Sequence, residues 1–378
     1  MARGERDPAF TSEELEKLVD GVLPQYTLVY DPHDKQSGST AVTSSEGSAQ
    51  HYPSERRGSN KTMNCTNQSS VKDFILLGFS DFNPYLQKSM FVLLLLVYLA
   101  TLIGNMTIVL LVTVANGLQT PMYRFLRNLS FLEICLTSTI LPKAISGVNP
   151  NNSIISFADC AVQMFLFVSL GATECILLVV MAYDRHVAIC NPLRYLVIMN
   201  PKMCVSLMTV SWMWGGSVSA VLTSFIFSWP YCGFNIINHF FCDMPAVLSQ
   251  ASADTFINRV TVFAAAMVCC ICPFIVIILS YVNILFTILS MSSAAGRHRA
   301  FSTCSSHLVS VTLFYGSKIC MYFRIRHSGT QERDKLLSIL YSVMTPMLNP
   351  LIYSLRNKDV KDALKSLIKR TGISPNTM

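Results

Sequence analysis

Seven long apolar segments limit how this chain can fold. A helix that crosses the hydrocarbon core of a bilayer needs about 20 apolar residues. The segments cover residues 89–115, 122–148, 158–185, 203–228, 258–291, 300–323 and 336–355. Charged residues make up only 13% of the chain, against about 25% in soluble domains. The sequence therefore predicts an all-α membrane protein, with a seven-transmembrane helix bundle over residues 89–355.

Polar segments flank the predicted bundle. Residues 1–62 lack a periodic apolar face, so we expect a disordered polar extension. Residues 63–88 are expected to form an extracellular glycosylated segment, because sequons occur at Asn64 and Asn67 within it and at Asn60 just before it. In residues 356–378, apolar and Lys side chains alternate at helical spacing. This pattern predicts a short amphipathic eighth helix on the inner leaflet, followed by a cytoplasmic tail.

The basic residues indicate orientation rather than a nucleic-acid partner. The net charge of +7 comes from short clusters between apolar segments, with no basic face interleaved with aromatic residues. Lys and Arg are more numerous on the side that is inside when the amino terminus is outside. Together with the sequons, this predicts a multi-pass plasma-membrane protein with an extracellular amino terminus.

An acid and a base end the third apolar segment. Asp184 and Arg185 stand together in "MAYDRHVAIC". Ionisable groups at the mouth of a membrane span are candidates for function. The alternative from the residues alone is a border pair that marks the membrane interface.

Polar residues inside the spans form a second group of candidates. Glu133 and Glu174 lie in the second and third spans, and Pro350 and Tyr353 lie in "PMLNPLIYSLRN" of the seventh. Two carboxylates inside one bundle repel each other, so one must take a proton or a cation must bind between them. Pro350 removes a backbone donor, which makes the inner end of the seventh span a candidate moving part that includes Tyr353.

The wording of these motifs resembles one family. "MAYDRHVAICNPLRY", "PMYRFLRNLSFLE", "RHRAFSTCSSH" and "PMLNPLIYSLRN" are similar to the motifs of olfactory receptors, which are class A G-protein-coupled receptors. The resemblance extends from about residue 64 to residue 370 and is strongest to the tetrapod-type branch. It implies a receptor that binds a small volatile odorant among spans 3, 5, 6 and 7. It also implies that a stimulatory olfactory-type G protein is activated and raises cyclic AMP.

The resemblance assigns roles to individual residues. It implies a set for G-protein coupling and activation: Asp184, Arg185, Tyr281, His307, Asn349, Pro350 and Tyr353. It implies that Glu133 and Glu174 hold a sodium ion with Asn105 and Asn349 nearby; the alternative is that both acids are protonated and hydrogen-bonded. No other cofactor is expected.

The resemblance also implies a disulfide between Cys160 and Cys242. A further Cys of the family is replaced by Ser252, so Cys232 loses its expected partner and either stays free or pairs with Cys65. Asn67 stands where the family usually carries its glycan.

Helical phase and the resemblance together predict the residues that contact the odorant. They are expected on the outer halves of four spans, where Phe, Met, Val and Ala suit a small apolar ligand. The set is Met164, Phe167, Val168, Gly171, Ala172, Ala265, Cys269, Tyr315, Lys318, Ile319, Tyr322, Ile339 and Ser342. Such stripes are also typical of helix packing.

Lys318 allows two interpretations. Its stem can extend to the outer water, which lies close to it along the helix. Alternatively, its ammonium points into the ligand site and selects odorants that carry a carboxylate or a polarised carbonyl, since no acid on the outer stripes can neutralise it.

Two other protein classes are weighed against an olfactory receptor. A non-olfactory class A receptor for another small ligand would want an acid on the outer third span, where Phe167 and Val168 stand instead. An ion-conducting transporter could use Glu133, Glu174 and Lys318, but the internal repeats common in transporters are not found. No enzyme is expected, because the sequence shows no nucleophile and base on a common face and no phosphate loop.

Overall fold

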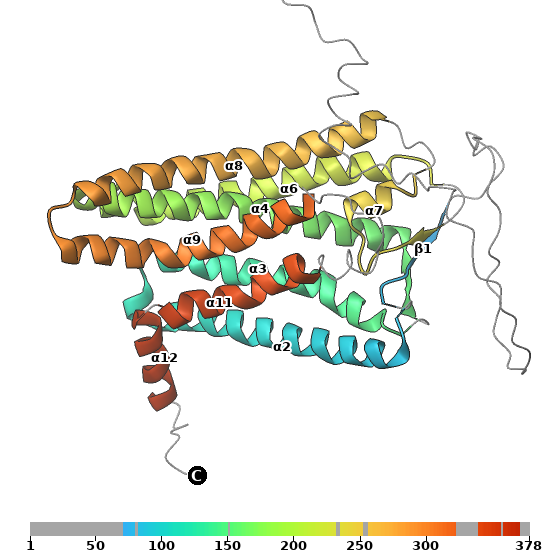
Figure 1. The fold of residues 1–378 in the computed structure, drawn as a ribbon, viewed down its shortest axis with the longest axis horizontal. Coiled ribbons are helices and arrows are strands. Elements are labelled where there is room, and N and C mark those ends of the chain that lie inside the picture. The colour runs from blue at the N-terminus through green and yellow to red at the C-terminus, as the bar shows by residue number, and fades with distance from the viewer. Residues whose placement is uncertain are drawn as a thin grey trace, which may run out of the picture.

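In the computed structural model, the chain forms a bundle of long helices that run side by side (Figure 1). The structure describes residues 71–79, 82–149, 152–231, 235–251, 256–322, 339–356 and 358–370. The bundle consists of α2 (Pro84–Val114), α3 (Pro121–Ser146), α4 (Phe157–Cys190), α6 (Pro201–Phe227), α8 (Phe256–Ser290), α9 (Ala294–Tyr322) and a last segment that joins η5 (Leu340–Met344) to α11 (Thr345–Arg356). Among the described residues, five helices are long and apolar enough to cross a membrane: α2, α3, α4, α6 and α8. The more polar α9 and α11 pack against each other and against the rest.

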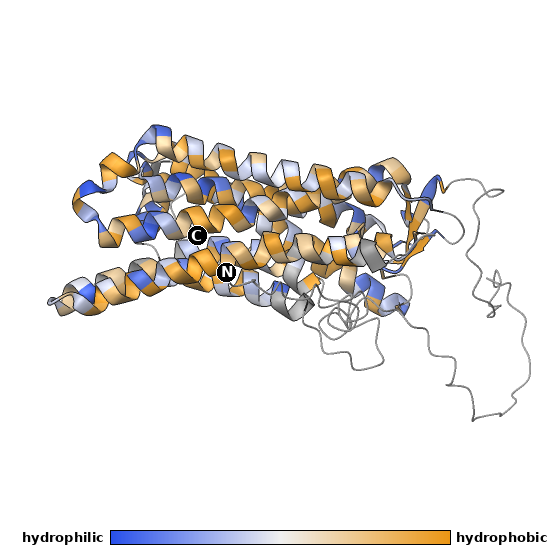
Figure 2. Ribbon diagram, turned by 90° about the horizontal axis from the view of Figure 1, so that it is seen from above, coloured by the Kyte–Doolittle hydropathy of each residue, from blue (hydrophilic) through white to orange (hydrophobic). Residues whose placement is uncertain are grey.

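The bundle has an apolar outside and a partly polar inside. Large apolar side chains such as Ile103 and Leu96 are 67% and 59% exposed, whereas Asn105 and Glu133 are fully buried. Figure 2 shows apolar residues along the lengths of the helices and hydrophilic ones gathered near the ends. A surface of this kind suits lipid rather than water, in agreement with the predicted membrane bundle.

Side-chain caps explain where three of the helices begin. The carboxamide oxygen of Asn83 accepts from the backbone N–H of Leu86, and that of Asn200 accepts from Met203, with Pro at the first helical position in both cases. The hydroxyl of Ser156 accepts from the backbone N–H of Asp159. Such caps satisfy N–H groups that have no partner within the helix. The cap at Asn83 makes α2 begin at Pro84, before the predicted boundary at residue 89.

A small sheet at the outer end was not predicted. It has the strand order β2-β1-β3 and is built from β1 (Asp73–Leu76), β2 (Ile154–Ser156) and β3 (Ile236–Ile237). Strand β1 pairs antiparallel with β2 and parallel with β3. Phe74 and Leu76 of β1 are buried. The predicted extracellular segment 63–88 is therefore tied in part to the loops of the bundle by strand pairing.

Short elements connect the long helices at the inner end. α4 runs to Cys190, beyond the predicted end at residue 185, and is followed by η4 (Pro192–Arg194) and α5 (Tyr195–Ile198). A single turn, η2 (Asn116–Leu118), joins α2 to α3.

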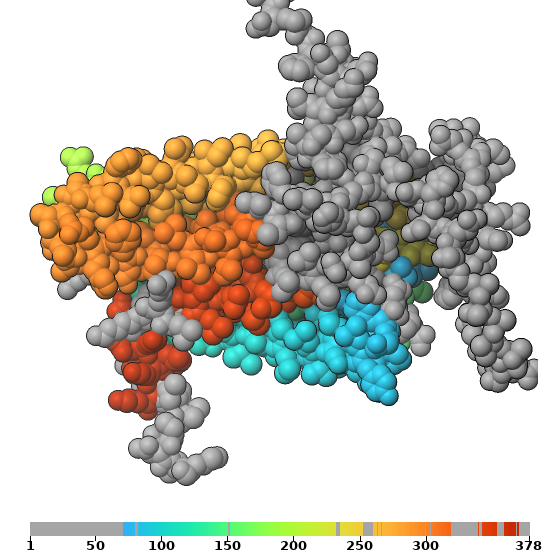
Figure 3. Space-filling model, viewed as in Figure 1, coloured from blue at the N-terminus to red at the C-terminus, as the bar shows by residue number. Residues whose placement is uncertain are grey.

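The eighth helix is present as α12 (Lys358–Arg370). Val360 is buried, and Ala363, Leu364 and Leu367 pack against the inner part of the core. In Figure 3, α12 (dark red) extends beyond the edge of the bundle at the lower left, past α11 and α2. The direction of α12 across the bundle (Figure 1) agrees with a helix that lies along the inner leaflet.

Candidate functional site

The acid and base at the inner end of α4 form a buried pair. The guanidinium Nη2 of Arg185 lies 3.1 Å from Oδ2 of Asp184, and both side chains are buried. The hydroxyl of Tyr195, on α5, donates to Oδ1 of Asp184 at 2.8 Å. Burial, together with the charge of Asp184, raises the pKa of Tyr195, so this phenol stays a donor. Tyr195 belongs to the "NPLRY" motif, yet sequence reasoning gave it no role.

Tyr281 of α8 pairs with His307 of α9. Its hydroxyl lies 2.7 Å from Nδ1 of His307, and the two rings stack with centroids 5.8 Å apart. This contact joins α8 to α9 near the middle of the bundle. Two members of the predicted activation set, Tyr281 and His307, thus pair with each other, while Asp184 and Arg185 pair at the end of α4.

A polar network joins four helices in the core. Nδ2 of Asn349 donates to Oε1 of Glu133, and the hydroxyl of Ser310 donates to Oδ1 of Asn349 at 2.7 Å. Nδ2 of Asn105 donates to the carbonyl oxygens of Pro346 and Thr101. The network therefore connects α2, α3, α9 and α11, just below the π-helical turn η5. π-Helical turns occur often at functional sites.

The network leaves two buried oxygens without a partner. Oε2 of Glu133 and Oδ1 of Asn105 make no hydrogen bond within the described part of the chain. Glu174, the second acid, is also buried and acts electrostatically on Glu133. A proton on Glu133 or a small hard cation, which prefers oxygen ligands, would satisfy these atoms. The described residues contain no group of three or more His, Cys, Asp or Glu suited to a metal ion, so soft-metal ligation is not indicated there.

Gly104 allows the first and last helices of the bundle to meet beside the network. A Cβ atom on Gly104 would lie 3.2 Å from Cβ of Pro350. The glycine thus places Asn105 of α2 within reach of the α11 backbone. Tyr353, one turn after Pro350, is buried in the inner core.

The predicted odorant contacts lie in neighbouring parts of the core rather than around one described cavity. Met164 and Val168 belong to the outer cluster, Tyr315 belongs to the inner one, and Ile339 belongs to a third cluster next to α2 and α3. Phe167 packs between clusters, and its ring lies 4.8 Å from that of Phe241. Ala172 and Ser342 are buried, and Gly171, Ala265 and Cys269 are half-buried.

Lys318 points into the bundle. Its Nζ lies 3.8 Å from Sγ of Cys175 on α4 and 4.2 Å from the ring centroid of Phe314. The expectation that its stem reaches the outer water is therefore wrong for this structure. The expectation that no acid can neutralise the ammonium is also incomplete, because Glu174, one residue before Cys175, interacts with it electrostatically. Helical phase alone did not show that an acid deeper on α4 comes within range.

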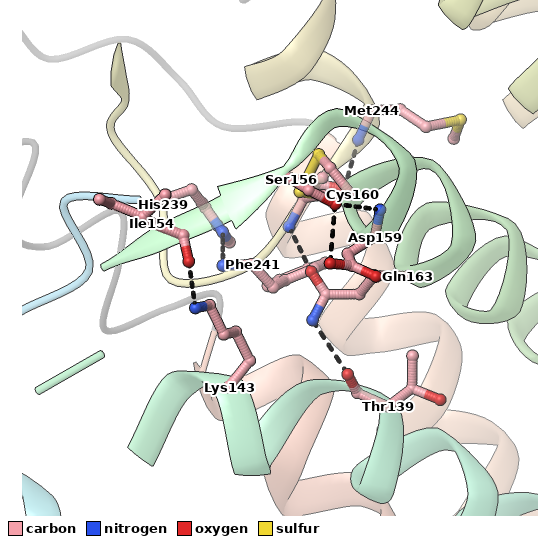
Figure 4. The surroundings of a disulfide bond; sticks show 12 residues. Thr139, Lys143, Ile154, Ser156, Asp159, Cys160, Gln163, His239, Phe241 and Met244 are labelled. Carbon is pink, nitrogen blue, oxygen red and sulfur yellow. Dashed lines mark hydrogen bonds between the residues drawn. A yellow bond between two sulfur atoms is a disulfide. The ribbon is translucent and has the colours of Figure 1, made fainter. Parts of the chain in front are cut away.

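A disulfide anchors the outer loop to α4. Cys160 and Cys242 are bonded, 82 residues apart in sequence, and their Cα atoms are 5.5 Å apart (Figure 4). Gln163 braces the same place, since its Oε1 accepts from the backbone N–H of Cys242 at 2.9 Å and its Nε2 donates to the carbonyl of Thr139 at 3.0 Å. Sequence reasoning missed Gln163, which is a lone polar residue near the start of an apolar span.

Two charged residues support the loops around the disulfide. Nζ of Lys143 donates to the carbonyl oxygens of Asn152 and Ile154 at 2.9 and 2.6 Å. Asp243 is buried, and its carboxylate accepts from the backbone N–H of Met244 at the start of α7 (Met244–Leu248). Burial raises the pKa of Asp243 to about 6.

Several predictions fall outside the described residues. They are the sequons at Asn60, Asn64 and Asn67, the fate of Cys232, and the extension 1–62. Ile319 and Tyr322 lie in α9, but their side chains are also outside the described part.

Comparison with known proteins agrees with the motifs. The family model for "Olfactory receptor" matches residues 94–370. Olfactory receptor 10A7 of Homo sapiens is 48% identical over 306 residues, which cover 81% of this chain and 96% of that protein. Olfactory receptor 10A4 of Homo sapiens is 50% identical over 305 residues, covering 81% and 97%. Olfactory receptor 2K2 of Homo sapiens is 47% identical over 295 residues, covering 78% and 93%. The chain therefore belongs to the olfactory receptor family, whose members are multi-pass G-protein-coupled receptors of the plasma membrane that sense odorants and are not enzymes.

Proposed function

We propose that this receptor binds a small volatile odorant among α4, α8, α9 and the segment 339–356, and activates a stimulatory olfactory-type G protein that raises cyclic AMP. The odorant would lie on the outer halves of these helices, against the predicted contact residues. Burial of an apolar ligand there contributes about 25 cal/mol per Å². One or two polar contacts would then set its orientation.

The observation that carries the coupling part of the proposal is the position of Arg185. In the part of the chain that the structure describes, its guanidinium pairs with Asp184 on the same helix rather than with α9. A movement of α9 therefore need not break an ion pair to expose Arg185. The Tyr281–His307 hydrogen bond is the contact that such a movement would strain.

The core network is proposed as the part that changes between states. Asn349, Pro350 and Tyr353 lie on α11, directly after the π-helical turn, where backbone hydrogen bonding is already irregular. The unpartnered oxygens of Glu133 and Asn105 support a proton or a sodium ion at this level, with Glu174 as the second acid. Carboxylate and amide oxygens are suitable ligands for a sodium ion, which would neutralise Glu133 and Glu174.

An odorant screen with a cyclic AMP readout tests the proposal. Cells that express the receptor should respond to at least one odorant, and cells without it should not. Arg185→Ala should abolish the response at equal surface expression, because the group proposed to dock the G protein is lost. A full response from Arg185→Ala would refute the coupling role. A calcium signal without cyclic AMP would refute the choice of G protein.

A further inference from the structure

Lys318 is a cation in the middle of a mostly apolar interface. Its ammonium donates to Sγ of Cys175 at 3.8 Å and lies over the ring of Phe314. Gly171 leaves room for it, since a Cβ atom there would be 3.9 Å from Nζ. A thiol and an aromatic face are weak partners, and a buried charge is costly unless an opposite charge compensates it.

Glu174 is the group that can compensate this charge. The described side chains that interact electrostatically with Lys318 are the thiols of Cys175, Cys270 and Cys269 and the carboxylate of Glu174. Nζ of Lys318 rests against Gly171 and Cys175 of α4, and Glu174, three residues after Gly171, shares that face of the helix and is the carboxylate among these groups. Glu174 is 2% exposed and immediately precedes Cys175 on α4.

Glu174 also belongs electrostatically to the core network. It acts on Glu133, whose Oε1 accepts a hydrogen bond from Asn349, which in turn accepts one from Ser310. Lys318 is thus close to the predicted odorant contact Gly171 and interacts electrostatically with an acid of the network. A change at the ammonium therefore affects both the odorant site and the network.

We infer that Lys318 is the counter-ion of Glu174, and that an odorant bearing a carboxylate or a strongly polarised carbonyl competes with Glu174 for its ammonium. When the ligand takes the ammonium, the charge of Glu174 is compensated only by the proton or cation at Glu133, and the repulsion between the two acids increases. This repulsion weakens the resting arrangement of the network around Asn349. The inference rests on the proposed function and adds to it a class of ligand and the step that links binding to activation.

Ligand-independent cyclic AMP, normalised to surface receptor, tests the counter-ion. Lys318→Met should raise it about tenfold, the factor for loss of one charge-assisted hydrogen bond. Lys318→Arg keeps the charge and should raise basal activity less than Lys318→Met does. Lys88→Met removes an exposed lysine from the outer part of α2 and serves as the matched control. Lys318→Gln is the second variant, in case Met impairs folding. Unchanged or lowered basal activity in both Lys318→Met and Lys318→Gln would overturn the inference.

A double-mutant cycle tests whether the two charges act on each other. Glu174→Gln removes the carboxylate that repels Glu133, so adding it to Lys318→Met should bring the raised basal activity of Lys318→Met back down by about the same factor. A double variant with basal activity as high as that of Lys318→Met alone would show that Glu174 has no part in the effect and would overturn the inference.

The ligand arm uses straight-chain carboxylic acids and aldehydes, with alcohols and alkanes of equal length. Lys318→Met should decrease sensitivity to the acids about tenfold and spare the alkanes. Glu174→Gln should lower the maximal cyclic AMP response to the acids, because the repulsion that links binding to activation is lost. The ligand class would be overturned if the wild-type receptor responded only to alcohols or alkanes, or if the variants changed the sensitivity to every ligand equally. If no odorant of any class raises cyclic AMP in the wild type, the proposed function itself fails, which is a distinguishable result.

Discussion

Replacing Asp243 with Asn should remove a pH-dependent part of the stability of the receptor. Asp243 follows the disulfide residue Cys242, is 6% exposed, and caps α7 through the backbone N–H of Met244. Burial raises the pKa of its carboxyl from 3.8 to about 6, although the hydrogen bond from Met244 opposes this rise. The ionised side chain is therefore less stable in the folded loop than in the unfolded chain.

The sign and the size of the effect follow from the two pKa values. At a pH above about 6, the ionised carboxylate costs the folded state about 3 kcal/mol, at about 1.4 kcal/mol for each pH unit between 3.8 and about 6. As the pH falls, the folded state takes up the proton first, so this cost shrinks to about half at pH 5 and vanishes below the unfolded value. The contribution of Asp243 to the free energy of unfolding therefore increases as the pH falls.

Thermal unfolding of the purified full-length receptor in detergent measures this effect. Asn keeps an oxygen that can cap α7 but carries no charge, so Asp243→Asn should melt several degrees higher than wild type near pH 7.5. The difference should narrow near pH 5. Other titrating groups are common to both proteins and cancel in the comparison. If the two melting temperatures differ by the same amount at both pH values, Asp243 is not the buried acid described above.

Three further predictions concern packing and hydrogen bonding. Gly215→Ala should lower the free energy of unfolding by about 1–3 kcal/mol through overpacking, because its Cβ atom would collide with the Thr173 side chain and the backbone of α4. Gly216→Ala meets open space and should melt like wild type. Equal melting temperatures of the two variants would contradict this. Gln163→Leu should cost about 1–3 kcal/mol for each partner left unsatisfied and reduce surface expression, measured by flow cytometry on intact cells. Tyr195→Phe should lower the melting temperature by a few degrees, because a hydrogen bond to the charged Asp184 is worth about 1.5–3 kcal/mol; a melting temperature equal to that of wild type would show that the bond contributes nothing.

The signals that predicted the bundle were local ones. Runs of apolar residues long enough to span a bilayer identify helices without knowledge of their neighbours, because the backbone of each helix satisfies itself. Glu133, Asn105 and Asn349 were predicted to lie near one another by resemblance, and the structure places Asn349 in contact with Glu133. Apolar and Lys residues alternating at helical spacing likewise predicted α12.

Contacts between distant segments could not be predicted in the same way. The pairing of Phe74 with Ile155, and of Ile75 with Ile236, depends on how two loops are folded back over the outer end of the bundle. Gln163 is one polar residue in an apolar run, and nothing in its neighbours shows that it will meet the N–H of Cys242. Short strands and single hydrogen bonds carry little sequence pattern, so their partners appear only when the chain is folded.

The sequence by itself determined the membrane bundle, the candidate charges within it and the family. Tertiary structure decided where those charges point. The rotation of α9 against α4 turns Lys318 away from the outer water and toward Cys175 and Glu174. The close approach of α4 and α6 likewise depends on Gly215 facing Thr173. Helix rotation and spacing are set by packing over the whole interface, and a side chain that is equally able to face water or the core is placed by that packing alone.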